Sequence, residues 1–143
     1  MNKTIIQENL PKHIAITMDG NGRWAKEKGK NRIFGHNQGI EAVRDTVEGA
    51  VEYGIKFLTL FAFSTENWNR PKHEVNALMK LLISSIHNET KTLLKNNIKL
   101  QTIGDTKQLP QQCQNELEEC IKLTKENSSM TLTLALSYSG KWE

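Results

Sequence analysis

Near the start of the chain, one short stretch combines the side chains that a phosphate-binding site needs. It reads Met18, Asp19, Gly20, Asn21, Gly22, Arg23 and Trp24. The two glycines allow the backbone to fold closely around a ligand and to turn its N–H groups toward an anion, and Arg23 offers a planar fork suited to phosphate oxygens. Asp-Gly and Asn-Gly are also common turn formers, and no Walker or GxGxxG pattern is present, so a plain polar turn stays open as the alternative.

A second polar stretch follows the apolar run 55–63. Its members are Ser64, Thr65, Glu66, Asn67, Trp68, Asn69 and Arg70. A Mg²⁺ ion on Asp19, the N–H groups of the glycine loop and three guanidinium groups would form a site for a diphosphate, because the metal and the guanidiniums neutralise its charge and help it to leave. The three arginines are Arg23, Arg32 and Arg70.

Four residues near these stretches each have two interpretations. His36 could donate to a phosphate, but by sequence alone it is interpreted as a cap of the helix that follows. Asn67 could be an ordinary loop former. Trp24 and Trp68 lie outside any apolar period. Their positions suggest walls for a ligand, although loop tryptophans also often cover a core.

The elements that must position these residues alternate between strands and helices. Short apolar runs predict buried strands at 13–18 and 55–63, a more exposed strand near an edge at 98–103, and a last strand at 130–138. Apolar residues at helical spacing predict helices from Asn37, as the cap, to Gly54, from Pro71 to Leu94, and over 109–125. Residues 25–34 are expected to form a loop or a short helical piece.

This alternation predicts an α/β fold, with a mainly parallel central sheet flanked by helices. Ligands bind such sheets where the carboxyl ends of the strands meet. The Asp19 stretch, residues 64–70 and the loop at Tyr138 are therefore expected to share one rim.

Length and composition fit a single domain over residues 1–143. No apolar run approaches the roughly 18 residues of a membrane span, and residues 1–10 are too polar for a signal peptide, so the cytoplasm is the expected compartment. Cys113 and Cys120 would lie about 10 Å apart in a helix, too far for a disulfide, and are expected to be reduced core residues. Residues 1–35 carry seven basic and three acidic side chains, a basic excess that would attract phosphorylated ligands.

Two long motifs closely resemble the cis-prenyltransferases, the family of the bacterial undecaprenyl diphosphate synthases. They are residues 13–25, HIAITMDGNGRWA, and residues 58–71, LTLFAFSTENWNRP; residues 32–36, 103–105 and 136–142 are also similar. The resemblance spans essentially the whole chain. It implies sequential 1'-4 condensation of isopentenyl diphosphate onto an allylic primer such as farnesyl diphosphate, with each new double bond cis, to give an undecaprenyl-type lipid carrier for cell-wall synthesis.

The resemblance also implies a role for each polar residue. Asp19 resembles the Mg²⁺-linked carboxylate that helps the diphosphate of the primer to leave, and Asn67 resembles the residue assigned to deprotonating the condensing substrate. Because a neutral carboxamide is a poor base, Asn67 could instead position that substrate while released diphosphate or water takes the proton. The residues similar to substrate-binding positions of the family are Gly20, Asn21, Gly22, Arg23, Trp24, Arg32, His36, Ser64, Thr65, Glu66, Trp68 and Arg70.

For the product, the resemblance implies an apolar tunnel with Leu78, Leu81 and Leu82 as wall candidates, and transient contact with a bilayer. It implies a homodimer for the full-length form. Members of the family continue well past Glu143, into a segment with an Arg-x-Ser motif and a metal-sharing Glu. The chain is therefore expected to be a fragment or truncated product that condenses poorly or not at all on its own.

Two other classes of protein compete with this interpretation. A non-catalytic partner subunit would keep the fold, but it would usually have lost the carboxylate and the arginines that this chain retains. A nucleic-acid-binding module is suggested by the basic first third of the chain. No nucleic-acid motif appears, however, and basic and aromatic residues do not interleave, so no nucleic-acid partner is expected. The absence of a DDxxD pattern disfavours the trans-type prenyltransferases.

Overall fold

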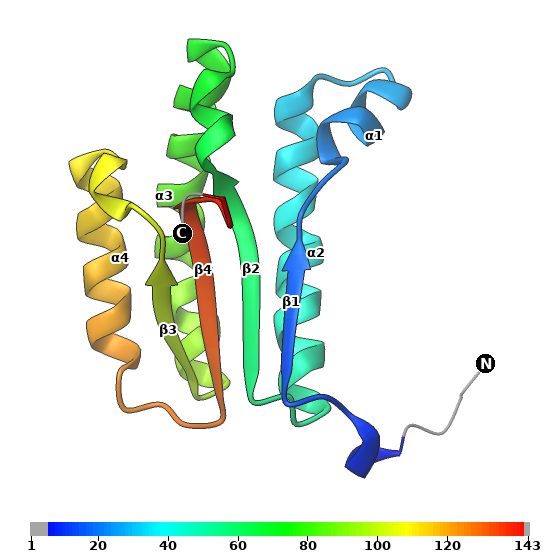
Figure 1. Ribbon diagram of the computed structural model, residues 1–143, viewed down its shortest axis with the longest axis vertical. Coiled ribbons are helices and arrows are strands. Elements are labelled where there is room, and N and C mark those ends of the chain that lie inside the picture. The colour runs from blue at the N-terminus through cyan, green and yellow to red at the C-terminus, as the bar shows by residue number, and fades with distance from the viewer. Residues whose placement is uncertain (1–5, 142–143) are drawn as a thin grey trace.

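The computed structural model describes residues 6–141, which form eight longer elements and three short 3-10 helices (Figure 1). In chain order the longer elements are β1 (His13–Thr17), α1 (Asn21–Glu27), α2 (Arg32–Glu52), β2 (Phe57–Ser64), α3 (Lys72–Lys95), β3 (Ile98–Ile103), α4 (Gln111–Thr124) and β4 (Met130–Tyr138). The 3-10 helices are η1 (Gln7–Asn9), η2 (Thr65–Asn69) and η3 (Thr106–Gln108). The expectations for residues 1–10 and 136–142 fall partly on residues outside the described range.

The four strands form one sheet in which every neighbouring pair is parallel, in the order β1-β2-β4-β3. The predicted α/β fold with a parallel sheet is thus confirmed, and β3 lies at an edge as expected. The carboxyl ends of the strands all point toward the rim that carries α1 and η2 (Figure 1). None of the helices within residues 6–141 has the length and apolar character that crossing a membrane requires.

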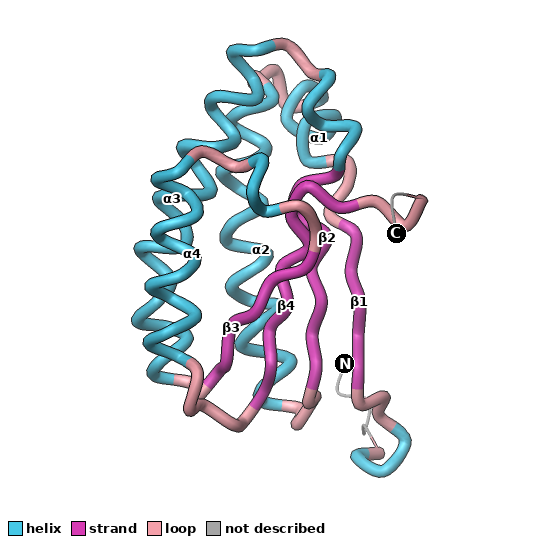
Figure 2. The backbone as a smooth tube through the Cα atoms, turned by 60° about the vertical axis from the view of Figure 1, so that its left-hand side comes forward, coloured by secondary structure: helices cyan, strands magenta, loops and turns pink. Residues whose placement is uncertain are grey.

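The core lies between the sheet and a layer formed by α2, α3 and α4 on one of its faces (Figure 2). The sheet contributes Leu58, Leu60 and Leu132 to this core. The helices contribute residues that include Val47 of α2 and Met79 of α3. Cys113 and Cys120 are buried and free in α4, as predicted. Burial raises the pKa of the Cys113 thiol to about 11, so both cysteines act as small apolar core residues.

The prediction of a buried first strand was wrong, because β1 is an edge strand and one of its faces is exposed. Its side chains alternate between half-buried and exposed, with His13, Ala15 and Thr17 exposed. Phe57 at the start of β2 is also exposed, so β2 is not buried on both faces along its whole length. Among the described residues, α2, α3 and α4 all lie on the other side of the sheet (Figure 2).

The predicted start of the first long helix was also wrong. The sequence placed its cap at Asn37, but α2 begins at Arg32. Asn31 is its cap: the backbone is extended there, and the side-chain oxygen accepts a hydrogen bond from the Phe34 N–H at 2.8 Å. Asn37 and His36 lie inside the helix, so neither caps it. Residues 25–34 were expected to form a loop or a short helical piece. They consist of the end of α1, a short turn and the first turn of α2, so the helical alternative is partly confirmed.

Candidate active site

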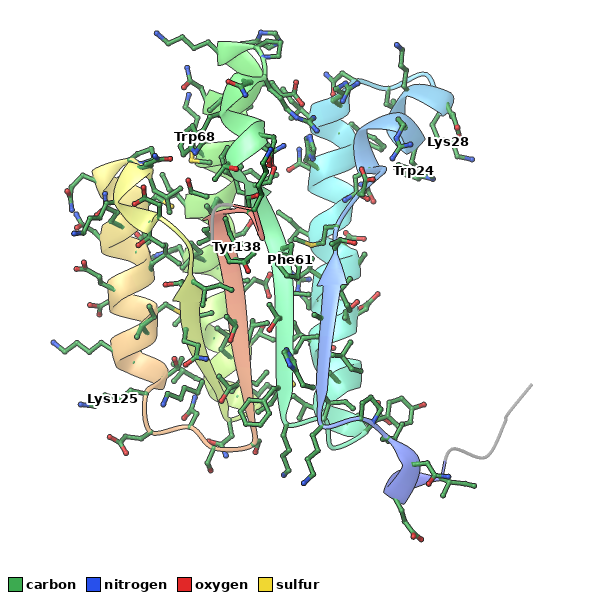
Figure 3. All side chains as sticks on the ribbon, viewed as in Figure 1. Trp24, Lys28, Phe61, Trp68, Lys125 and Tyr138 are labelled. Atoms are coloured by element: carbon green, nitrogen blue, oxygen red, sulfur yellow. The ribbon has the colours of Figure 1, made fainter. Side chains whose placement is uncertain are left out.

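A cleft of about 240 Å³ lies where β1, β2 and β4 end. Asp19 reaches it from just after β1, Ser64 from the end of β2, Asn67 from η2, and Arg70 from the residue after η2. Tyr138 at the end of β4 also lines the cleft, with its ring 5.6 Å from that of Phe61 (Figure 3). The structure therefore brings the three polar stretches to one rim, as the strand order requires.

Asp19 stands at the solvent side of this cleft. Its carboxylate Oδ1 lies 3.1 Å from Arg23 NH2, one turn later, and the two side chains are 82% and 70% exposed. An ion pair at this exposure is weak, so either charge can exchange its partner for a ligand. Gly20 makes the turn that separates Asp19 from α1, with a φ of +92° that favours glycine.

The first turns of α1 and α2 are packed unusually closely through Gly35. A Cβ atom at Gly35 would lie 2.0 Å from the backbone oxygen of Asn21, and one at Gly39 would lie 2.6 Å from Asn21 Nδ2. The Arg32 side chain lies against Gly22, where an added Cβ would be 3.1 Å from Arg32 Cγ. Small residues at these positions hold the Asp19 stretch against the start of α2.

Asn67 is fixed by the residue that precedes η2. Its Oδ1 accepts hydrogen bonds from the Ser64 N–H at 2.8 Å and from the Ser64 hydroxyl at 3.1 Å. Because the carboxamide oxygen is engaged in this way, the NH₂ group is the end of Asn67 that a ligand in the cleft can use. A neutral donor binds and orients an anion, but it does not remove a proton.

Trp68 anchors the same short helix to the end of β4. Its Nε1–H donates to Ser137 Oγ at 2.9 Å, and its ring packs edge-on against Phe63 at 4.8 Å. Trp24 lies elsewhere: it is 43% exposed and stacks on Phe34 with the ring centroids 6.1 Å apart. Trp24 points out beside Lys28 at α1, away from Phe61 and Tyr138 (Figure 3).

A buried cluster behind the cleft includes Glu74, which the sequence interpretation missed. Arg70 NH1 donates to Glu74 Oε1 at 2.9 Å, and His36 Nε2 lies 3.7 Å from the same oxygen. Glu74 is only 7% exposed. Burial favours its neutral form, but the hydrogen bond and charge of Arg70 outweigh this effect and hold the pKa of Glu74 below its usual range. Glu74 therefore stays ionised and fixes the Arg70 guanidinium at the cleft.

His36 is the second titratable member of this cluster. Burial lowers the pKa of His36; the Glu74 carboxylate opposes that shift in part, and the charges of Arg70 and Arg32 add to it. Within the described residues, its buried Nε2 makes no hydrogen bond. The imidazole is thus neutral at pH 7, and its Nε2 is a buried nitrogen that faces Glu74.

An apolar cavity of about 250 Å³ lies beside the cleft, between α2, α3 and the sheet. Leu78, Leu81 and Leu82, the predicted wall candidates, all line it. The cavity and the cleft share five lining residues, which are Met18, Ala62, Phe63, Asn67 and Arg70. An amphiphile with an anionic head and a hydrocarbon tail would fit such an adjoining pair of spaces.

The remaining predicted residues lie around this pair of spaces. Asn21 and His36 line the apolar cavity. Gly20, Gly22, Arg23, Arg32, Thr65 and Glu66 line neither space. Arg23 reaches the cleft through its contact with Asp19, and the charge of Arg32 acts on both His36 and Glu74.

A metal ion could be held here by one carboxylate. Within residues 6–141, no group of three or more His, Cys, Asp or Glu side chains could hold one. Mg²⁺ commonly binds through one or two carboxylates together with water and substrate phosphates. The exposed Asp19 beside a cleft suited to a phosphate fits this mode of binding, which needs the ligand and the ion together.

The cluster predicts a specific titration of His36. We expect its imidazole to titrate below the ordinary value of 6.5, and Glu74→Gln should lower the pKa further because it removes the carboxylate that favours the protonated form. The folded state then binds fewer protons than the unfolded state. The contribution of His36 to stability is therefore present above pH 6.5 and lost as the pH falls through the folded pKa. Histidine NMR shifts measure this pKa; Glu116→Gln, beside His87, is the control, and a His36 pKa that rises in Glu74→Gln would contradict the assignment.

The comparisons with known proteins agree with this geometry. Residues 17–143 match the family model described as "Putative undecaprenyl diphosphate synthase". The chain is 57% identical over 134 residues to the isoprenyl transferase of Chlorobaculum tepidum. It is 51% identical over 142 residues to the ditrans,polycis-undecaprenyl-diphosphate synthase ((2E,6E)-farnesyl-diphosphate specific) of Vibrio parahaemolyticus. These matches cover 94% and 99% of the chain but only 51% and 57% of the relatives, so the chain spans about half their length.

Solved structures show the same arrangement. Lavandulyl diphosphate synthase from Lavandula x intermedia, in complex with dimethylallyl diphosphate, superposes with a TM-score of 0.89 at 34% identity, over 92% of this chain and 57% of that chain. A probable undecaprenyl diphosphate synthase from Campylobacter jejuni superposes with a TM-score of 0.76 at 32% identity, over 94% and 58%.

Proposed function

Because the chain belongs to the undecaprenyl diphosphate synthase family of cis-prenyltransferases, we propose that the protein it comes from condenses isopentenyl diphosphate with an allylic primer, farnesyl diphosphate. The product is a polyprenyl diphosphate of the undecaprenyl type, with cis double bonds. The observation that carries this proposal is that the polar cleft and the apolar cavity lie side by side and share Asn67 and Arg70 in their linings. A prenyl diphosphate has a charged diphosphate head, which suits the polar cleft, and a hydrocarbon tail, which suits the apolar cavity.

The charged residues of the cleft would act on the diphosphate of the primer. Arg70, oriented by Glu74, would bind its oxygens, and Arg23 would do so after leaving Asp19. Asp19 would hold Mg²⁺, which when bound supplies charge that stabilises the departing diphosphate. The neutral His36 would donate or accept one hydrogen bond at the inner end of the site. The glycines and Asn21 would shape the loop around the phosphates, with Arg32, Ser64, Thr65 and Glu66 beside it.

In the condensation, Asn67 would position the substrate and would not act as the base. The C–O bond between C1 of the primer and its diphosphate breaks, a bond forms from C1 to C4 of isopentenyl diphosphate, and C2 of that substrate loses a proton. The carboxamide oxygen of Asn67 is held by Ser64, so its NH₂ group would orient the substrate. Released diphosphate or water would take the proton.

The apolar cavity would hold the growing hydrocarbon. Burying each CH₂ group is worth about 0.8 kcal/mol, so a tail that fills the cavity would contribute most of the affinity. Trp24 and Trp68 would support the two loops from outside, because Trp24 stacks on Phe34 and Trp68 bonds to Ser137. Action in the cytoplasm, a homodimer, and transient contact with a bilayer that receives the product belong to the same proposal.

Incorporation of radiolabelled isopentenyl diphosphate tests the proposal. We expect a version extended to the natural end of the protein to incorporate label when it is given farnesyl diphosphate and Mg²⁺, and the 143-residue chain to bind the primer but incorporate far less. An extended protein that binds primer without incorporation would be a non-catalytic partner subunit. Oligonucleotide binding with a steep salt dependence would instead indicate a nucleic-acid-binding module.

A further inference from the structure

Two polar contacts join α2 to α3 along the apolar cavity. The first is the pair of His36 and Glu74 near the cleft. The second lies further along both helices, where Arg44 Nε donates to both carboxylate oxygens of Glu89 at 3.1 Å and Arg44 NH2 contacts Oε1. We call this bidentate Arg44–Glu89 pair the clasp.

The clasp forms part of the cavity wall, because both of its side chains line the cavity. Arg44 follows His36 by eight positions, so the two contacts lie about 12 Å apart along α2. The wall between them is made of half-buried apolar side chains from the two helices, which are Ile40, Val43, Leu78, Leu81 and Leu82. A hydrocarbon chain that enters past Arg70 would lie along this wall and reach the clasp.

The cavity continues beyond the clasp. Leu93 near the end of α3, Leu100 of β3 and Cys120 of α4 also line it, and all three are buried. A chain that reaches the clasp can therefore continue toward these buried residues, or leave sideways between α2 and α3 if the helices separate. Glu89 and Arg44 hold the helices together at this point.

The environment of the clasp favours its charged form. The hydrogen bond and charge of Arg44 hold the pKa of Glu89 below its usual range, although burial opposes this shift. The other charged groups that act on Arg44 are Glu41 and Glu48, on its own helix. The side chains of Arg44 and Glu89 are 45% and 23% exposed. A pair at this exposure adds little to the stability of the fold, so its effect is on the wall that it closes.

We propose that the clasp is a specificity-determining contact that keeps the hydrocarbon chain inside the cavity and so sets the longest chain that the protein accommodates. The inference rests on the proposed function for its natural ligand, since the chain would be that of the growing prenyl diphosphate. With the clasp formed, the chain is directed toward the buried residues Leu93 and Cys120. Without it, a longer chain can pass out between α2 and α3.

A double-mutant cycle of Arg44→Ala and Glu89→Ala tests the proposal. In the full-length protein, we expect each single variant to extend the longest product by at least one isoprene unit, and the double variant to match the single variants because all three lack the same contact. Glu116→Ala is the matched control, since it breaks the His87–Glu116 pair between α3 and α4, whose members do not line the cavity. An unchanged longest product in Arg44→Ala, effects that add in the double variant, or an equal shift in Glu116→Ala would overturn the inference.

A second readout separates the clasp from the proposed function. Linear alcohols of increasing length are tested for binding to the 143-residue chain, where each buried CH₂ group should tighten binding about fourfold until the cavity is filled. We expect the length at which the gain stops to increase in Arg44→Ala and Glu89→Ala but not in Glu116→Ala. If the full-length protein incorporates no isopentenyl diphosphate, the proposed function fails, while this shift still supports the clasp. A wild-type chain without length-dependent binding, or variants with an unchanged limit, would overturn the clasp.

Discussion

Replacing Asp19 with alanine should reduce turnover of the full-length protein by on the order of 10³-fold, because the proposed chemistry depends on charge stabilisation of the departing diphosphate. Asp19 is the carboxylate that lines the polar cleft, and its side chain is 82% exposed beside Arg23. The primer should still bind, since Arg70 and the apolar cavity are unaffected. Binding of farnesyl diphosphate by calorimetry, together with turnover at saturating substrate, separates the two effects.

Asp19→Asn and Asp45→Asn are the controls for this prediction. Asp19→Asn keeps the size of the side chain and removes only its charge, so it should lose nearly as much turnover as the alanine variant. Asp45 lies exposed on α2 and lines neither space, so its change should leave turnover as in the unmodified protein. Full turnover in Asp19→Ala would refute the role given to this carboxylate.

The order of strands and helices could be predicted because each main element carries its own apolar period. The run before Asp19 and the run before Ser64 both became parallel strands, and the parallel arrangement placed the two polar stretches at one rim. The rim follows from topology alone, because all carboxyl ends of a parallel sheet lie on the same side. The meeting of Asp19 and Arg70 was therefore accessible from the sequence.

The start of α2 could not be read from apolar spacing, because the cap and the charged first residue carry no periodic signal. Asn31 has an extended backbone, and its side chain accepts a hydrogen bond from the Phe34 N–H. In the sequence, the only sign of this cap is the single asparagine. Asn37 gave the same signal further along, yet its side chain donates to the Ile33 oxygen within the helix. Asparagine competes for backbone groups in both settings, so the residue type alone does not distinguish them.

Glu74 was missed for a related reason. An acidic residue in the first turn of a helix after proline is typical of a helix start, and this role accounts for its presence without a site. Its spacing of four residues from Arg70 was the available signal for an ion pair. Its approach to His36, however, depends on how α3 packs against α2, which no local pattern contains. The exposure of one face of β1 was not predicted for the same reason, since the coverage of a sheet face depends on how other segments of the chain pack.

Adding one methyl group at Gly35 should disrupt the site from a distance. The new Cβ of Gly35→Ala would lie 2.0 Å from the backbone oxygen of Asn21, and a backbone atom cannot rotate away. We expect α1 to be displaced, the free energy of unfolding to fall by about 1–3 kcal/mol, and the affinity for farnesyl diphosphate to fall at least tenfold because the Asp19 stretch moves with α1. Urea denaturation and calorimetric binding measure the two quantities.

Gly49→Ala, in the same helix, should have the opposite effect on stability. Within residues 6–141, no atom beyond the local helix backbone lies within 4 Å of the added Cβ there. Replacing a helical glycine with alanine stabilises a helix by about 0.5–1 kcal/mol. Affinity for the primer should not change, since Gly49 lines neither the cleft nor the cavity. If Gly35→Ala lost stability but kept full affinity, the close packing of α1 on α2 would serve the fold and not the position of the phosphate-binding loop. If both glycine variants were equally stable, the contact between Gly35 and Asn21 would not exist in solution.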